Sequence, residues 1–164
     1  ITSAILGVNY VNATPAELEP DPAIVEVAQA FAAKSGATIT VTNDPVEAVR
    51  HADAVYTNVW AAMGEESQFA ERVRLMSPYQ VNAELVSHIE NPDWIFLHCL
   101  PAFHNAETDY AADIKDKHGI EAMEVTDDVF YCDRGRQFEQ AENRMHTIKA
   151  IMAATLGNLY IPCV

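Results

Sequence analysis

The sequence predicts an α/β fold, with a doubly wound, mainly parallel sheet that carries helices on both faces. Five short runs rich in β-branched and apolar residues alternate with stretches of helical character along the 164 residues. Such alternation is typical of right-handed βαβ crossovers, which make neighbouring strands parallel. Because 49% of the residues are hydrophobic, the chain can bury one sizeable core, and we expect a single domain.

We expect strands at residues 8–12, 38–42, 54–57, 94–98 and 122–125. Residues 1–7 have the pattern of the last turns of a helix closed by Gly7, so we expect the chain to begin inside an element. Ligands of doubly wound folds bind beyond the carboxyl ends of strands. Residues that follow strands, at 58–64, 98–104 and 125–130, are therefore the first candidates for function.

Local sequence marks three helix starts. Asp21-Pro22 opens a helix that ends near Gly36, with proline at the first helical position, where it loses no hydrogen bond. Asp44-Pro45-Val46-Glu47 has the form of a capping box, in which the glutamate reaches back to the aspartate amide. Ser77-Pro78-Tyr79-Gln80 repeats this pattern and predicts a helix over 77–89.

The charge and the cysteines exclude several classes of protein. With 24 acidic and 10 basic residues the formal charge is -14, which argues against nucleic acid or an anionic membrane as a partner and suits a cationic small substrate. No run approaches the ~18 apolar residues of a membrane span, and no leader resembles a secretion signal, so we expect a cytoplasmic protein. Cys99, Cys132 and Cys163 form no CxxC pair, which predicts reduced thiols and no structural metal site.

The segment 96–104 runs from an apolar strand into Cys99, which is flanked by His98 and His104. A Cys/His nucleophile pair is one interpretation, although adjacent strand residues face opposite ways, so His98 is poorly placed to activate Cys99. A zinc site at Cys99 and His104 lacks further ligands at the usual spacing. A buried, inert thiol at a strand end is the third interpretation.

Two other segments carry candidate residues. The loop 57–66 follows a strand and contains Trp60 and Gly64, so it is a candidate functional loop. The alternative interpretation is an ordinary connection between elements. The segment 139–149 is helical in pattern, and Arg144 stands beside its apolar stripe, where an arginine is more often a surface ion-pair residue than a ligand. The stripe consists of Met145, Ile148, Met152, Leu156 and Leu159.

Together these strings resemble ornithine carbamoyltransferases, from about Gly7 to the C-terminus. The tetrapeptide HCLP at 98–101, the run EVTDDVF at 124–130 and the run QAENRMHTIKA at 140–150 occur in the family's order. The resemblance implies that residues 1–164 are the C-terminal, ornithine-binding lobe, without the carbamoyl-phosphate lobe and the family's first strand, which would precede Ile1. The ending at 157–162 resembles catabolic members, which act in arginine breakdown.

The resemblance implies transfer of a carbamoyl group from carbamoyl phosphate to the ornithine side-chain amine, giving citrulline and phosphate, or the reverse. The attacking amine must be neutral, yet an alkyl ammonium has a pKa near ~10.4, so the site must help remove a proton. Cys99 and the carbonyls around Leu100 match the positions that hold this amine, with His98 and Pro101 in the same motif. Arg144 matches the arginine that polarises carbamoyl phosphate.

The resemblance further implies no metal, no cofactor, and a trimer-based homo-oligomer that includes the other lobe.

The chain departs from the family in the loop D-V-W-x-S-M-G. Asn58 stands in place of the aspartate that binds the α-ammonium of the substrate, and Ala62 replaces serine, while Met63 and Gly64 match. An asparagine accepts a hydrogen bond but carries no charge. The alternatives are therefore a non-catalytic homologue or an enzyme for putrescine or a modified ornithine.

Overall fold

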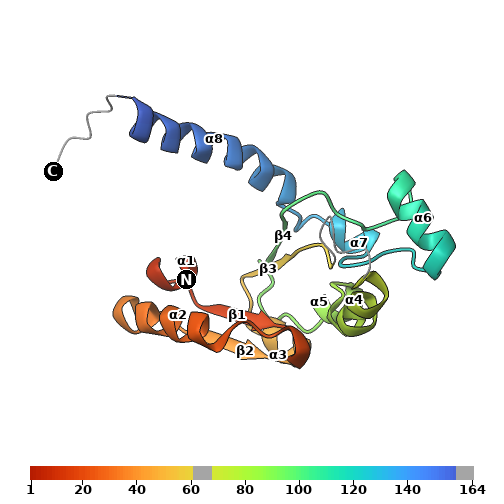
Figure 1. Cartoon of the computed structure of the whole chain (residues 1–164), viewed down its shortest axis with the longest axis horizontal. Helices are drawn as coiled ribbons and strands as arrows, with labels where there is room; N and C mark the ends of the chain where they lie inside the picture. Colours follow the sequence, from red (N-terminus) through yellow and green to blue (C-terminus); the bar gives the residue numbers. More distant parts are fainter. Residues whose placement is uncertain (61–67, 158–164) are drawn as a thin grey trace.

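Four short strands form two parallel pairs in the described part of the chain (Figure 1). The computed structural model describes residues 1–60 and 68–157. β1 (Tyr10–Ala13) pairs with β2 (Ile39–Thr42), and β3 (Ala54–Thr57) pairs with β4 (Ile95–His98). The α/β class and the parallel pairing are confirmed, although the strands make two pairs and not one continuous sheet.

The N-terminal helices follow the local sequence signals. α1 (Thr2–Ile5) is followed by Gly7, whose φ of 75° is the left-handed conformation that glycine adopts without strain. α2 (Pro22–Ser35) begins where the Asp21 carboxylate accepts a hydrogen bond from Ala23 N at 2.8 Å, and it ends at Gly36 with φ 83°. The closing glycines at positions 7 and 36 and the cap at Asp21 are confirmed. A single 3-10 turn, η1 (Ala16–Leu18), lies between β1 and α2.

The predicted capping box at α3 (Pro45–Val49) is half confirmed. Asp44 Oδ1 accepts from Val46 N at 2.9 Å and from Glu47 N at 3.0 Å. The amide of Asp44, however, donates to Thr42 Oγ1 at 3.2 Å, so the hydroxyl of the preceding strand replaces the bond predicted from the Glu47 carboxylate.

The predicted helix over 77–89 is wrong. Ser77–Tyr79 forms only a 3-10 turn, η3, in which Ser77 Oγ donates to Val73 O of the preceding helix at 2.6 Å and caps nothing. Helix α5 (Ala83–Val86) starts later, because Asn82 Oδ1 accepts from Leu85 N at 3.0 Å. The true cap therefore lies five residues after the predicted one.

The chain between these turns is extended because it pairs with a distant segment. Val81 N donates to Glu124 O at 2.9 Å, and Thr126 N donates to Val81 O at 3.1 Å. Val81 and Val125 thus form an isolated parallel bridge. The fifth expected strand, 122–125, is reduced to this bridge in the described structure.

The described residues form a main core, to which β3 and β4 contribute, and a second apolar cluster. The main core consists of Val49, Val55, Val81, Leu85, Phe96, Val125, Val129 and Phe130. The second cluster consists of Trp60, Phe69, Ile114 and Met123, with Phe103 packed against it. The remaining helices are α4 (Phe69–Met76), α6 (Asp109–His118), α7 (Asp127–Phe130) and α8 (Gln137–Leu156).

The long helix α8 is attached to β4 at its N-terminus and extends away from the body of the molecule (Figure 1). Phe96 N donates to Arg134 O and Arg136 N donates to Phe96 O, both at 2.9 Å. The helical prediction is confirmed, but its apolar stripe is exposed, from 47% at Met145 to 81% at Leu156. Leu159 lies outside the described residues. Among the described helices, none is long and apolar enough to cross a membrane.

Candidate functional site

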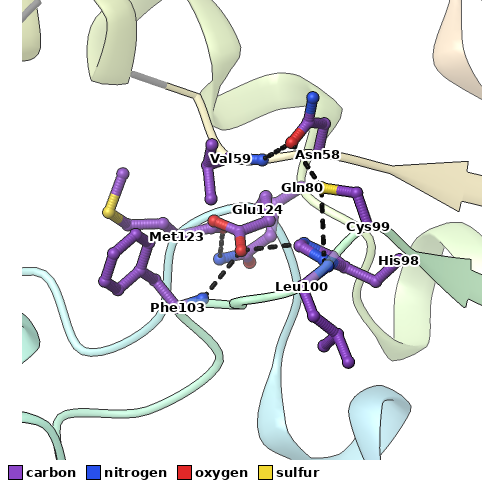
Figure 2. Close-up of polar contacts among 9 residues, drawn as sticks. All are labelled: Asn58, Val59, Gln80, His98, Cys99, Leu100, Phe103, Met123 and Glu124. Carbon is purple, nitrogen blue, oxygen red and sulfur yellow. Dashed lines mark hydrogen bonds and ion pairs between the residues drawn. The ribbon is translucent and has the colours of Figure 1, made fainter. Parts of the chain in front are cut away.

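The carboxyl ends of β3 and β4 bring Asn58 and Cys99 together (Figure 2). Thr57 is paired with His98 in the parallel register, so the residues that follow each strand are neighbours. Cys99 Sγ donates to Asn58 Oδ1 at 2.8 Å, and the same oxygen accepts from Val59 N at 2.8 Å. Both acceptor positions of this carbonyl are therefore engaged within the chain.

The side chain of His98 is buried and uses both ring nitrogens. Its Nδ1 accepts a hydrogen bond from Leu100 N at 2.8 Å, and its Nε2 lies 3.1 Å from Glu124 Oε1. A nitrogen that accepts carries no proton, so we assign the proton to Nε2, which donates to the carboxylate. The hydrogen-bond partners thus select the neutral Nε2–H form of the imidazole.

The turn after β4 has an unusual backbone. Leu100 has a φ of 52°, in the left-handed region that costs a residue other than glycine about 1–3 kcal/mol. The following peptide bond, to Pro101, is cis. Leu100 packs against the main core, and Glu124 Oε1 accepts from Phe103 N at 2.7 Å, so contacts on both sides hold the turn in place.

These contacts bear on the three interpretations of Cys99 from its sequence. Its sulfur lies 3.9 Å from His98 Nδ1, which already accepts from Leu100 N, so the geometry disfavours a Cys/His nucleophile pair. Among the described residues, no group of three or more histidine, cysteine or acidic side chains could hold a metal ion. Cys99 is partly exposed, which disfavours the buried, inert thiol.

The second histidine of the motif, His104, contacts Asp127 and Phe130. Its Nδ1 lies 2.7 Å from Asp127 Oδ1, and its ring stacks on Phe130 with centroids 3.9 Å apart. Asn105 Nδ2 donates to the same Asp127 oxygen at 2.9 Å. The hydrogen bond from His104, followed by that from Asn105, holds the pKa of the Asp127 carboxyl below its ordinary value.

A cavity of about 500 Å³ lies between the ends of these strands and α8. Two of the residues expected from sequence, Cys99 and Arg144, line it together, and His98 contributes to the wall. Asn58 accepts a hydrogen bond from Cys99, but Asn58, Leu100 and Pro101 are not among the residues that line the cavity. Ala62 and Met63 lie outside the described residues. The residues lining the cavity are Tyr56, His98, Cys99, Gln140, Ala141, Asn143, Arg144, Thr147 and Ile148.

Sequence reasoning missed several of these residues. Gln140, Asn143 and Thr147 recur at helical spacing around Arg144, so they share its face of α8, and this spacing was a usable signal. Tyr56 lies in β3, two positions before Asn58, which follows the end of that strand. Glu124 carried no local signal, because its partners His98 and Phe103 lie more than twenty residues upstream.

Comparison with known proteins gives a consistent result. The family model described as the Asp/Orn binding domain of aspartate/ornithine carbamoyltransferase matches residues 1–155. A curated relative, the catabolic ornithine carbamoyltransferase of Streptococcus gordonii, is 60% identical over 162 residues, which are 99% of this chain and 48% of the relative. The chain therefore spans about half the length of the curated relatives it matches.

Solved structures show the same likeness. The ornithine carbamoyltransferase of Pyrococcus furiosus superposes with a TM-score of 0.78 at 40% identity, over 96% of this chain and 44% of that one. An N-acetyl-L-ornithine transcarbamylase variant superposes with a TM-score of 0.71 at 25% identity, over 93% and 41% of the two chains. Members with different named substrates thus share this arrangement of strands and helices.

Proposed function

The chain belongs to the aspartate/ornithine carbamoyltransferase family, as its Asp/Orn binding domain, and from this premise we propose that it supplies the ornithine-binding half of a carbamoyltransferase site. The reaction joins ornithine and carbamoyl phosphate to give citrulline and phosphate. The reverse, catabolic direction is proposed from the S. gordonii relative, which is named catabolic. The observation that carries the proposal is that Cys99 and Arg144 line one cavity of about 500 Å³.

Cys99 and the carbonyls around Leu100 are proposed to hold the reacting amine. Thiol and carbonyl groups accept hydrogen bonds and so can orient the amine, and because they are neutral they favour its protonated form less than a carboxylate would. The left-handed conformation of Leu100 is kept by the contacts of His98 and Glu124. The acceptors are therefore held in place before the substrate arrives, which lowers the barrier to attack.

Arg144 is proposed to bind the carbamoyl phosphate across the cavity. Its guanidinium offers a planar fork of donors that suits a phosphate or a developing carbonyl charge. Arg144 is the one lysine or arginine among the described lining residues, in a chain with a formal charge of -14. A dianion therefore depends on this side chain for attraction within the described part of the domain, and we propose that the rest of its binding site comes from a carbamoyl-phosphate lobe.

The exposed face of α8 supports the existence of that second lobe. Met145, Ile148 and Leu156 are between 47% and 81% exposed, and apolar surface of this extent is usually covered by a partner. The chain matches 48% of the S. gordonii relative, and we propose that the second lobe corresponds to the part of the relative that is not matched. We also propose a trimer-based homo-oligomer in the cytoplasm, acting in arginine metabolism without a cofactor, as the family resemblance implies.

A chimera tests the proposal. This chain, joined to the carbamoyl-phosphate lobe of the S. gordonii relative, should form citrulline from ornithine and carbamoyl phosphate. Arg144→Gln should lower kcat by about 10²- to 10³-fold, as for the loss of one donor to a developing charge. Arg134→Gln is the matched control, because Arg134 is partly exposed and pairs with Asp93 outside the cavity. A folded chimera without carbamoyl transfer to ornithine, putrescine or N-acetylornithine would disprove the proposal.

A second candidate is an enzyme for putrescine or a modified ornithine, and the geometry of Asn58 favours it. The Asn58 side chain is neutral, and its carbonyl oxygen already accepts from Cys99 and Val59. Little is left to bind the α-ammonium of ornithine. A family member named for N-acetyl-L-ornithine has the same fold. The remaining alternative is a non-catalytic homologue, which has lost both the aspartate that binds the α-ammonium and the activity.

The two substrates can be separated by restoring the anchor. In the chimera, Asn58→Asp with Ala62→Ser should tighten ornithine binding about tenfold, because a hydrogen bond to a charged partner is worth ~1.5–3 kcal/mol against ~0.5–1.5 for a neutral one. Putrescine lacks the α-ammonium and should gain much less. Calorimetric titration of both ligands, with carbamoyl phosphate present, measures the contrast. Equal shifts for both ligands would show that position 58 does not bind the α-ammonium.

A further inference from the structure

A buried carboxylate joins the two ends of the turn that carries Cys99 and Leu100. Glu124 Oε1 accepts from His98 Nε2 at 3.1 Å and from Phe103 N at 2.7 Å (Figure 2). Glu124 is 0% exposed and His98 is 1% exposed, so the bond between them is shielded from water, while the bond from Phe103 N is partly buried. We name this arrangement the Glu124 clasp.

The segment that carries Glu124 is held by hydrogen bonds of its own. Gln80 Nε2 donates to Ala122 O at 3.0 Å and to Met123 O at 2.8 Å, immediately before Glu124. The backbone of Glu124 accepts from Val81 N at 2.9 Å. These bonds hold the segment that presents the carboxylate, so the position of Oε1 is set independently of the turn that it binds.

The clasp also determines which nitrogen of His98 carries the proton. Because Glu124 accepts at Nε2, the other nitrogen is free to accept from Leu100 N, at 2.8 Å. That bond supports the left-handed backbone of Leu100, whose φ is 52°. Without the carboxylate only the Leu100 N–H opposes the other tautomer, which has a proton on Nδ1 and would repel that N–H.

We propose that Glu124 is a positioning residue, which acts through His98 to fix the Leu100 turn and with it the Cys99 thiol and the neighbouring carbonyls. The proposal rests on the proposed function, since it explains how the amine-binding groups are held. In this role His98 is a structural support and not the base for Cys99. A base would need a free lone pair at Nδ1, and that lone pair is bonded to Leu100 N, with the sulfur 3.9 Å away.

Two substitutions at one position separate support from proton transfer. Glu124→Gln keeps an oxygen that accepts from both His98 and Phe103 but removes the carboxylate. Glu124→Ala removes both bonds. If Glu124 only positions the turn, Glu124→Gln should retain the Nε2–H tautomer, the rate of Cys99 alkylation and the pH profile of alkylation. Glu124→Ala should lose the single tautomer and change the alkylation rate.

The tautomer can be read directly in the 164-residue chain by NMR of 15N-labelled histidine. We expect His98 in the Nε2–H form near neutral pH in the wild type and in Glu124→Gln. The matched control is Gln137→Ala, because Gln137 is 2% exposed and donates to Phe130 O at 2.7 Å, so its loss also removes a buried bond without touching the turn. This control should leave the His98 tautomer and Cys99 alkylation as in the wild type.

In the two-lobe chimera, Glu124→Ala should lower kcat/KM for ornithine about 100-fold, the effect of displacing a reacting group by about 1 Å. Glu124→Gln should recover most of this loss, with the pH dependence of kcat unchanged. An inactive wild-type chimera would count against the proposed function alone, because the tautomer and alkylation data still decide the clasp. A wild-type His98 with its proton on Nδ1, or a Glu124→Gln variant with a shifted pH profile, would overturn the positioning role.

Discussion

Replacing Asn58 by aspartate is the most direct probe of the site, because it requires only this chain. In the structure Cys99 Sγ donates to Asn58 Oδ1 at 2.8 Å, and Val59 N donates to the same oxygen. A carboxylate of the same shape can accept both bonds, so Asn58→Asp changes the charge beside the thiol and leaves the geometry in place.

The expected size of the effect is set by the distance. Two negative charges 2.8 Å apart repel by about 1.5 kcal/mol even when screened as in bulk water. Because a difference of about 1.4 kcal/mol is a factor of ten, the thiolate fraction of Cys99 at a given pH should fall about tenfold or more. The thiolate is the nucleophile toward alkylating reagents, so the alkylation rate should fall by the same factor.

The assay is alkylation with iodoacetamide at constant pH, followed by mass spectrometry of the peptide that contains Cys99, with Cys132 as the internal reference. Asn9→Asp is the matched control, since Asn9 Oδ1 also accepts two hydrogen bonds, both from Thr38, and bonds neither cysteine. Equal Cys99 rates in Asn58→Asp and the wild type, with the fold intact by circular dichroism, would refute the Cys99–Asn58 contact.

The structure supports three further predictions. The isolated chain should show no carbamoyl transfer above background in a citrulline assay, and activity without the second lobe would contradict the two-lobe proposal. Hydrogen bonds lower the pKa of Asp127 in the folded chain below its ordinary value of 3.8. The ionised carboxylate therefore stabilises the fold above a pH of about 3.8, and this stabilisation is lost as the pH falls through the lower pKa of the folded state. Asp127→Asn should therefore make the unfolding midpoint depend less on pH in the acid range. In urea unfolding, Ile151→Ser on the exposed surface of α8 should change stability by less than about 0.5 kcal/mol, whereas Phe96→Ala, at 0% exposure, should lose about 3–5 kcal/mol.

Elements with local signals were predictable from sequence, and elements that depend on distant partners were not. The helix from Pro22 to Ser35 has an aspartate cap and a closing glycine, and both act as expected. The segment 77–89 has an equally good local signal, yet Val81 is drawn out of a helix by hydrogen bonds to the chain at 124–126. Pairing between segments so far apart in the sequence has no trace in a local pattern, so tertiary context overrode the cap.

The candidate site divides in the same way. Cys99 and Arg144 were named from motifs, and they line one cavity because Arg134 and Arg136 tie the start of α8 to β4 through backbone bonds to Phe96. The support beneath Cys99 was not predictable. Glu124 was visible only as the first letter of a run, and its meaning depends on bonds to His98 and Phe103, which adjoin it only in the folded chain.

Position 58 links the two candidate functions through one physical trade-off. Restoring the aspartate should improve the anchor for the α-ammonium, but it should also place a second carboxylate beside a turn already held by Glu124 and suppress the thiolate of Cys99. If the amine-binding role of Cys99 needs only a neutral thiol, the aspartate helps ornithine without harm, and Asn58 weakens an ornithine enzyme. If the role needs the thiolate, the neutral Asn58 favours the thiolate of Cys99. A substrate without an α-ammonium then loses no binding from the missing aspartate. The pH dependence of kcat in the Asn58→Asp chimera, compared for ornithine and putrescine, therefore distinguishes the two functions.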